Sequence, residues 1–476
     1  MNGRPTEPVR GRAGGPAGVW ATIREALRGS QQDFTQVPIG RATILLAVPM
    51  VMEMAMESLF AVVDIFWVSK LGSDAIATVG LTESLLAMIY AVALGLSTAA
   101  TAVVARRTGE KDPDGAGVAA VHIIAVSILV ALVIGAGGAL FGPSLLALMG
   151  ASPSVVATGS GYAQLMLGGN ITIVLLFVLN AIFRGAGDAA TAMRSLWLAN
   201  ILNIVLGPCF IFGLGPLPEM GVTGAAVATT IGRGLGVVYQ FFVLTRGRGR
   251  VTVRKQHVRA DAEILGGLMR IAGNGTLQML VETTSWLGLV RILSEFGSAA
   301  LAGYTIATRV MVFALLPSWG MANAAATLVG QNLGAGKPDR AERSVWVAGL
   351  YNFVFLGVVG LALTILPDPI VGIFTSEASV GAYGVDCLRI LAFGFLFYAY
   401  GMVIVQAFNG AGDTMTPMLL NLACFWVFKI PMAYLLAVPG EFGPRGVFVA
   451  VTVAYSVQTV AGILLFRRGR WKNERV

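Results

Sequence analysis

Long apolar stretches alternate with short polar connections along nearly the whole chain, beginning near residue 40. A helix needs roughly 20 apolar residues to cross a bilayer. The pattern therefore predicts an all-α integral membrane protein with twelve transmembrane helices. Their approximate positions are residues 40–68, 75–105, 118–141, 156–183, 195–214, 222–245, 264–294, 299–330, 344–366, 382–408, 417–437 and 445–466.

The connections between these stretches differ in their content of Lys and Arg. Alternate connections are basic, as in residues 106–111, 246–270 and 337–343, whereas the others hold little beyond Lys70 and Arg445. Cytoplasmic loops of membrane proteins carry such an excess of Lys and Arg. We therefore expect a multi-pass protein of the plasma (inner) membrane with both termini in the cytoplasm.

The polar segment 1–38 contains one amphipathic stretch. Val19, Trp20, Ile23 and Leu27 share one helical face, with arginines beside it. Such a helix is expected to lie on the inner surface of the membrane.

The second half of the chain repeats motifs of the first half. RGAGDAATAM begins at residue 184 and NGAGDTMTPM at residue 409, an offset of 225 residues with six of ten positions identical. The same offset aligns residues 103–116 with residues 328–341. We expect the two GAGD motifs to form tight turns, because glycine permits a helix to end and the chain to reverse.

The repeat predicts two six-helix lobes. Six is an even number, so both halves enter the membrane in the same sense, and the pseudo-twofold axis runs along the membrane normal. The expected parts are a cytoplasmic tail at 1–38, an N-lobe at 39–245, a basic cytoplasmic linker at 246–262, a C-lobe at 263–466 and a basic tail at 467–476.

Composition supports this fold class. Hydrophobic residues make up 56% of the chain and charged residues 12%, about half of the ~25% that is usual in globular domains. The net charge of +8 lies mainly in the expected cytoplasmic loops, which argues against a nucleic-acid partner. The three cysteines and two histidines show no metal-ligand spacing. No metal site, cofactor or enzyme activity is expected.

Four acidic residues lie inside the predicted spans: Glu53, Glu57 and Asp64 in the first and Glu282 in the seventh. A carboxylate at the bilayer centre costs about 2.5–3.5 kcal/mol, and such groups usually face the protein interior. At roughly 100° per residue, the three acids of the first span fall within ~40° of one another. The 225-residue offset places Glu57 and Glu282 at equivalent positions.

These acids suggest an ion-coupling site. Burial disfavours the charged form of a carboxylate, which then exchanges a proton more readily or holds a monovalent cation. The alternative is a structural ion pair with Arg233, Arg309 or Lys429, which also lie within spans.

Several motifs identify a family resemblance. They are VVDIFWVSKLG in the first span, RGAGD, NGAGD, LVGQNLGAGKPDRA after the eighth span and TGAAVAT at 223–229. Over roughly residues 36–468 the chain resembles the multidrug and toxin extrusion (MATE) transporters. The resemblance implies a V-shaped pair of lobes. It also implies efflux of organic, often cationic or amphipathic compounds, driven by inward flow of H⁺ or Na⁺.

The resemblance also suggests site residues in the N-lobe. Asp64 matches the first-helix aspartate that serves the family's cation site. Asn203 matches the asparagine of the fifth-helix N-x-x-x-D pattern, which here reads NIVLG, so Gly207 stands in place of the second acid. Thr229 or Thr230 matches the sixth-helix threonine.

In the C-lobe, Glu282 resembles the seventh-helix acid of some relatives. Their tenth-helix acid has no counterpart, since Tyr398 or Tyr400 occupies that region. Each lobe thus lacks one carboxylate. Because hard cations need several oxygen ligands, this favours H⁺ as the coupling ion, with Na⁺ at Asp64 and Asn203 as the alternative.

The expected function is therefore secondary active efflux by an antiporter. The expected partners are cationic or amphipathic small molecules and membrane lipids, and the protein is expected to act as a monomer. A second candidate is a lipid-linked sugar flippase of the same superfamily. It would need a strongly cationic cleft, whereas acids dominate the first span here.

Overall fold

The computed structural model describes residues 16–247, 249–259, 261–474 and 476, and these are helical with no strand among them. A short amphipathic helix, α1 (Pro16–Arg28), precedes the first lobe and leaves Trp20 71% exposed. Residues 1–15 of the predicted cytoplasmic tail lie outside the described residues.

The first lobe contains the helices before the basic linker. They are α2 (Ile39–Ser69), α3 (Ser73–Gly109), α4 (Pro113–Leu148), α5 (Pro153–Gly168), α6 (Ile171–Gly185), α7 (Ala189–Phe212) and α8 (Val222–Thr245). The helices α5 and α6 follow one another as a single span. The linker holds the short helix η1 (Lys255–His257).

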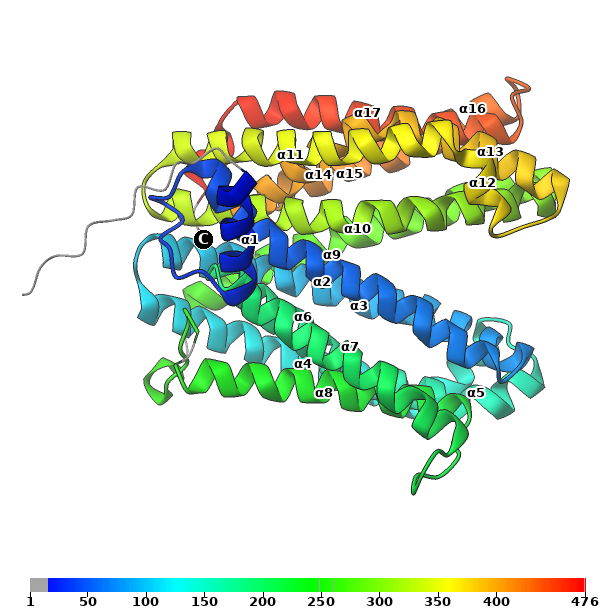
Figure 1. Cartoon of the computed structure of the whole chain (residues 1–476), viewed down its shortest axis with the longest axis horizontal. Helices are drawn as coiled ribbons and strands as arrows, with labels where there is room; N and C mark the ends of the chain where they lie inside the picture. The colour runs from blue at the N-terminus through cyan, green and yellow to red at the C-terminus, as the bar shows by residue number, and fades with distance from the viewer. Residues whose placement is uncertain (1–15, 248, 260, 475) are drawn as a thin grey trace, which may run out of the picture.

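The second lobe contains the remaining helices. They are α9 (Ala262–Leu293), η2 (Ser294–Phe296), α10 (Ser298–Gly334), α11 (Pro338–Ile365), α12 (Pro367–Gly372), α13 (Ala378–Phe393), α14 (Phe395–Ala411), α15 (Met415–Asn421), the π-helix η3 (Leu422–Lys429), α16 (Ile430–Ala437), α17 (Pro444–Arg467) and η4 (Arg470–Asn473). Figure 1 shows the two lobes side by side, with α1 and the C-terminus at the same end of the molecule.

The prediction of twelve spans in two lobes is confirmed. Ten helical segments of the described residues are long and apolar enough to cross a membrane, and the pair α13 and α14, bent by 57°, is the eleventh. The helix α9 takes the remaining predicted position, and polar residues such as Arg270, Gln278 and Glu282 lower its apolar character.

The two GAGD motifs form equivalent turns. Gly187 and Gly412 have φ of +85° and +92°, a conformation that glycine adopts without strain. The Asp188 carboxylate accepts a hydrogen bond from the backbone N–H of Thr191 at 3.2 Å, and Asp413 accepts one from Thr416 at 3.1 Å. These residues therefore end one helix and cap the next in each lobe.

The lobes meet closely at the end that holds α1 and the C-terminus. An added Cβ at Gly109 would clash with the carbonyl of Gln331, and one at Gly334 would clash with that of Arg106. Between the lobes, Gln331 Nε2 donates to the carbonyl of Gly185 at 2.9 Å. Direct backbone contact between α3 and α10 thus closes this end.

Candidate functional site

Three cavities adjoin one another: two lie between the lobes, and the smallest lies within the second lobe. Their volumes are about 110, 250 and 540 Å³, and all three share Met279 and Trp319 as wall residues. Glu57 lines the 250 Å³ cavity, whereas Glu282 lines the other two. Each lobe therefore contributes a carboxylate to one set of adjoining spaces, which we call the cleft.

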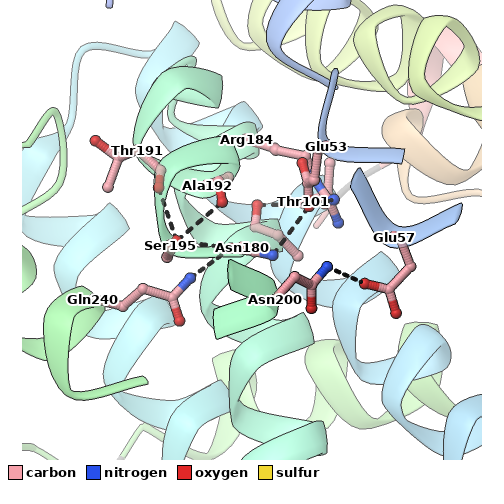
Figure 2. Close-up of polar contacts among 11 residues, drawn as sticks. Glu53, Glu57, Thr101, Asn180, Arg184, Thr191, Ala192, Ser195, Asn200 and Gln240 are labelled. Atoms are coloured by element: carbon pink, nitrogen blue, oxygen red, sulfur yellow. Dashed lines mark hydrogen bonds and ion pairs between the residues drawn. The ribbon is translucent and has the colours of Figure 1, made fainter. Parts of the chain in front are cut away.

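Glu53 does not line this cleft. It lies inside the first lobe at 1% exposure, where one carboxylate oxygen accepts hydrogen bonds from Asn180 Nδ2 at 3.0 Å and Arg184 Nη1 at 2.9 Å. Figure 2 shows the three side chains converging. Glu53 thus forms a structural ion pair, the alternative considered for these acids, but with Arg184, which was not among the expected partners.

The pair belongs to a wider buried network. The amide oxygen of Asn180 accepts hydrogen bonds from Gln240 Nε2 at 2.5 Å and from Ser195 Oγ at 3.3 Å. These groups come from α6, α8 and α7, as Figure 2 shows. The network joins three helices behind the wall of the cleft.

Glu57 has a looser environment. Its carboxylate accepts a hydrogen bond from Asn200 Nδ2 at 3.0 Å and lies 3.9 Å from Nη2 of Arg233. The buried Arg233 guanidinium also donates to the hydroxyl of Tyr90 at 3.2 Å. Glu57 therefore faces the cleft with a positive charge at its side.

Asp64 is half-buried and interacts electrostatically with Arg233 and Glu83. Within the described residues, no group donates a hydrogen bond to its carboxylate. Glu83 is exposed and interacts electrostatically with Arg309 of the second lobe. Of the first-span acids, Asp64 is thus the one whose oxygens are left for a proton or a cation.

Asn203 and Thr229 lie together. Asn203 Nδ2 donates to Thr229 Oγ1 at 2.6 Å, and both residues are buried. A Cβ built at Gly207 would have its nearest contacts, Asn203 Oδ1 and Trp67 Cδ1, at 3.9 Å. The space left by the missing acid is therefore open. No hydrogen bond between described residues joins Asp64 to this pair.

In the second lobe, Glu282 accepts a hydrogen bond from the hydroxyl of Tyr455 at 3.0 Å. The ring of Tyr455 meets that of Tyr398 edge-on, with the ring centroids 4.7 Å apart. The Tyr398 hydroxyl is buried and has no hydrogen-bond partner within the part of the chain that the structure describes. The fold thus brings Glu282 and Tyr398 together in the wall of the 110 Å³ cavity.

Lys429 is a cleft residue that sequence reasoning considered only as a counter-ion. It is 2% exposed, lines the 540 Å³ cavity and interacts electrostatically with Glu282. A charged residue within an apolar stretch is the sequence signal that could have identified Lys429 as a functional residue. Tyr455 offered no such signal, since a tyrosine in a span is usually part of the packing.

The charge of the cleft differs from the expected excess of acids. Arg233 stands beside Glu57 in one lobe, and Lys429 stands near Glu282 in the other. Both cations come from helices distant in sequence from the acids that they face. The cleft therefore presents groups of both signs.

Comparisons with known proteins agree with this arrangement. The sequence model of the MatE family matches residues 49–209 and 276–435, one segment in each lobe. The chain is 26% identical over 442 residues to a probable multidrug resistance protein NorM of Thermotoga maritima, covering 93% of this chain and 95% of the relative. It is 24% identical over 443 residues to a FAD transporter of Shewanella oneidensis, with coverage of 90% and 95%.

A solved structure shows the same fold. An outward-facing multidrug resistance MATE family transporter matches with a TM-score of 0.86 at 27% identity, covering 95% of this chain and 98% of that one. The two matched family segments contain Asp64, Asn203, Glu282 and Lys429, whereas Thr229 and Tyr455 lie outside them.

Proposed function

Because the chain belongs to the MatE family, we propose that it works as an antiporter that exports small organic compounds in exchange for protons. The observation that carries the proposal is that both lobes place a carboxylate in one cleft, Glu57 and Glu282. Transporters built from repeats bind their cargo between the repeats. The relatives named as a probable multidrug resistance protein and a FAD transporter do not favour the lipid-linked sugar flippase.

The walls of the cleft suit amphipathic cargo. Trp286, Trp319, Tyr90 and Met279 line the 540 Å³ cavity, and ligand pockets of roughly 300–1,000 Å³ with mainly apolar walls accommodate drug-sized molecules. The carboxylates would attract a cationic group on such a molecule. Cationic and amphipathic compounds are therefore the cargo that we propose.

Protons fit the coupling site better than Na⁺. A sodium shell needs several oxygen ligands, but Gly207 supplies none and Tyr398 stands where some relatives have an acid. Asp64 needs no further ligand to accept a proton. We propose that its protonation from outside and the binding of cargo exclude each other, since a carboxylate cannot serve both at once.

Orientation follows from the charges. We propose that the closed end, with both termini, faces the cytoplasm, so that protons enter from the opposite side. Inward movement of one charge through 100 mV supplies about 2.3 kcal/mol. That is sufficient to export an uncharged or zwitterionic compound against a tenfold gradient, which costs about 1.4 kcal/mol. One-for-one exchange with a monovalent cation moves no net charge, so the pH difference alone drives it.

The test uses proteoliposomes and the cation ethidium, with a pH gradient and a Na⁺ gradient imposed separately. Asp64→Asn keeps the shape of the side chain but cannot titrate. We expect it to abolish efflux driven by the pH gradient while ethidium counterflow, which needs no ion gradient, continues. Glu282→Gln should reduce gradient-driven efflux or narrow the range of cargo.

Glu441→Gln is the matched control, because Glu441 is exposed in a connection outside the cleft. Wild-type coupling in both Asp64→Asn and Glu282→Gln would contradict the proposed mechanism. Efflux that responds to the Na⁺ gradient but not to the pH gradient would show that the coupling ion is Na⁺ and not H⁺.

A further inference from the structure

The penultimate span of the second lobe is interrupted by a π-helix, η3, over Leu422–Lys429. Pro431 follows shortly after it, and a proline lacks the N–H of the regular ladder and crowds the carbonyl four residues earlier. A wider turn accommodates that defect. Such π-segments are rare and are frequent at functional sites.

Two contacts hold the π-helix against α9. Ser285 Oγ donates to the carbonyl of Phe425 at 3.1 Å, and Trp426 Nε1 donates to the carbonyl of Val281 at 3.2 Å. The residues from α9 flank Glu282 in sequence. The same contacts therefore fix Glu282 and the π-helix relative to each other.

Lys429 is the last residue of this π-helix. Its ammonium lies 4.3 Å from the ring centroid of Phe425 and 5.5 Å from that of Tyr455. Within the described residues it makes no hydrogen bond, and no carboxylate oxygen lies within 4.0 Å of it. The nearby Glu282 is instead bonded to the hydroxyl of Tyr455.

An ammonium has three N–H donors, and a buried charge without hydrogen bonds is costly. The two aromatic rings offset part of that cost through cation–π contacts, but they leave the donors unused. Lys429 also lines the 540 Å³ cavity, whose wall includes Trp286 and Tyr304. A ligand in this cavity would find an apolar aromatic surface and a cation with donors to spare.

We infer that Lys429 binds an anionic group of the cargo, so that the transported class includes aromatic amphiphiles that bear a carboxylate. The inference rests on the proposed export function and extends it from cations to zwitterions and anions. Glu282, on the same cavity, supplies the opposite preference. The two residues together make the cleft sensitive to how charge is placed on the cargo.

Two dyes test this directly. Rhodamine 6G is a cation with an ester group, and rhodamine 19 is the corresponding free carboxylic acid, a zwitterion at neutral pH. Their binding to the purified full-length protein in phosphatidylcholine nanodiscs is measured by fluorescence anisotropy, without any ion gradient. The pair differs only in the group that Lys429 would recognise.

We expect Lys429→Met to weaken binding of rhodamine 19 by roughly tenfold or more, the size of a charge-assisted hydrogen bond. Binding of rhodamine 6G should stay within about twofold or improve, since a hydrogen bond to an ester is at most weak. Lys429→Arg should retain the carboxylate preference. Glu282→Gln should act in the opposite sense and weaken rhodamine 6G selectively, a pattern that misfolding does not produce.

Lys70→Met is the control, because Lys70 is exposed just beyond the end of α2. Equal loss of both dyes in Lys429→Met, or unchanged binding of rhodamine 19, would overturn the inference. Displacement of rhodamine 19 by added phosphatidylglycerol would also overturn it, because the site would then belong to a lipid headgroup.

The outcome is separable from that of the proposed function. A protein that discriminates between the dyes through Lys429 but exports neither would refute antiport and leave the inference standing. Suppose instead that the protein exports rhodamine 6G, but Lys429→Met does not change the binding of one dye relative to the other. That result would refute the inference alone.

Discussion

The acidic side chains of the first span behave differently although they share one helical face. Glu53 has two hydrogen-bond donors, one of them a buried arginine, whereas Asp64 has no donor among the described residues. A carboxylate that is paired with a buried arginine holds the structure. An unpaired one is available for exchange. At this scale, the partners of each acid decide its role.

This difference predicts opposite effects on stability. Glu53→Gln removes the counter-charge of Arg184 and leaves a buried guanidinium unpaired, which typically costs about 3–5 kcal/mol. We expect a loss of that order in the free energy of unfolding, measured by SDS titration with tryptophan fluorescence. Asp64→Asn should change the stability far less, because it breaks no hydrogen bond.

The double variant Glu53→Gln, Arg184→Met provides the control. Removing both charges together should recover part of the lost stability, since the unpaired cation disappears. Equal stability of Glu53→Gln and Asp64→Asn would show that the Glu53–Arg184 pair does not support the fold.

At the scale of elements, small residues set how closely the lobes approach. Glycines let the backbones of membrane helices come into direct contact, and α3 meets α10 in this way at Gly109 and Gly334. The closed end thus depends on glycines at the positions where α3 and α10 touch. The same helices run on to line the cleft, so their separation at one end affects its shape.

We predict that Gly109→Ala opens the closed end, because the added methyl group would overlap the carbonyl of Gln331. Spin labels at Lys111 and Asp339, which are both exposed, report the separation of the lobes by pulsed electron resonance. Both proteins are labelled after the native cysteines have been replaced. The distance distribution of Gly109→Ala should lie at longer values than that of the protein with Gly109. Gly137→Ala is the control, since nothing lies within 4 Å of a Cβ there. The same distribution in both variants would contradict the role of Gly109.

On the scale of the whole molecule, the segment before α2 ties the lobes together. Arg194 donates to the carbonyl of Arg28 at 2.7 Å, and Arg250 donates to that of Gln32 at 2.6 Å. From the second lobe, Lys337 donates to the carbonyl of Thr35 at 2.9 Å. Basic residues at the closed end therefore bind backbone carbonyls of the segment before α2, in addition to setting the expected orientation in the membrane.

The proposed orientation can be tested by labelling intact cells with an impermeant thiol reagent, in a cysteine-free background. Cysteines placed at the exposed positions Ser73 and Glu441 should react from outside, because their connections carry few basic residues. A cysteine at Lys255, in the basic linker, should react only after the cells are permeabilised. Labelling of Lys255→Cys in intact cells would contradict the proposed orientation.

The sequence alone determined the spans, the two lobes and the turns that cap them. These follow from local signals: a bilayer demands long apolar helices, and a tight turn demands glycine at positive φ. It also located the acids, since charge in an apolar stretch is visible without a structure. The repeat placed Glu57 and Glu282 at equivalent positions, and both line the cleft.

Only the tertiary structure decided which acids are paired, and that the Lys429 ammonium makes no hydrogen bond among the described residues. The Glu282–Tyr455 bond joins residues 173 positions apart, and the Glu53–Arg184 pair spans 131 positions. Helical periodicity relates residues within one helix and carries no information about which face of another helix lies opposite. The pairing of Glu53, the freedom of Asp64 and the exposure of Lys429 to the cavity therefore arise from packing between helices.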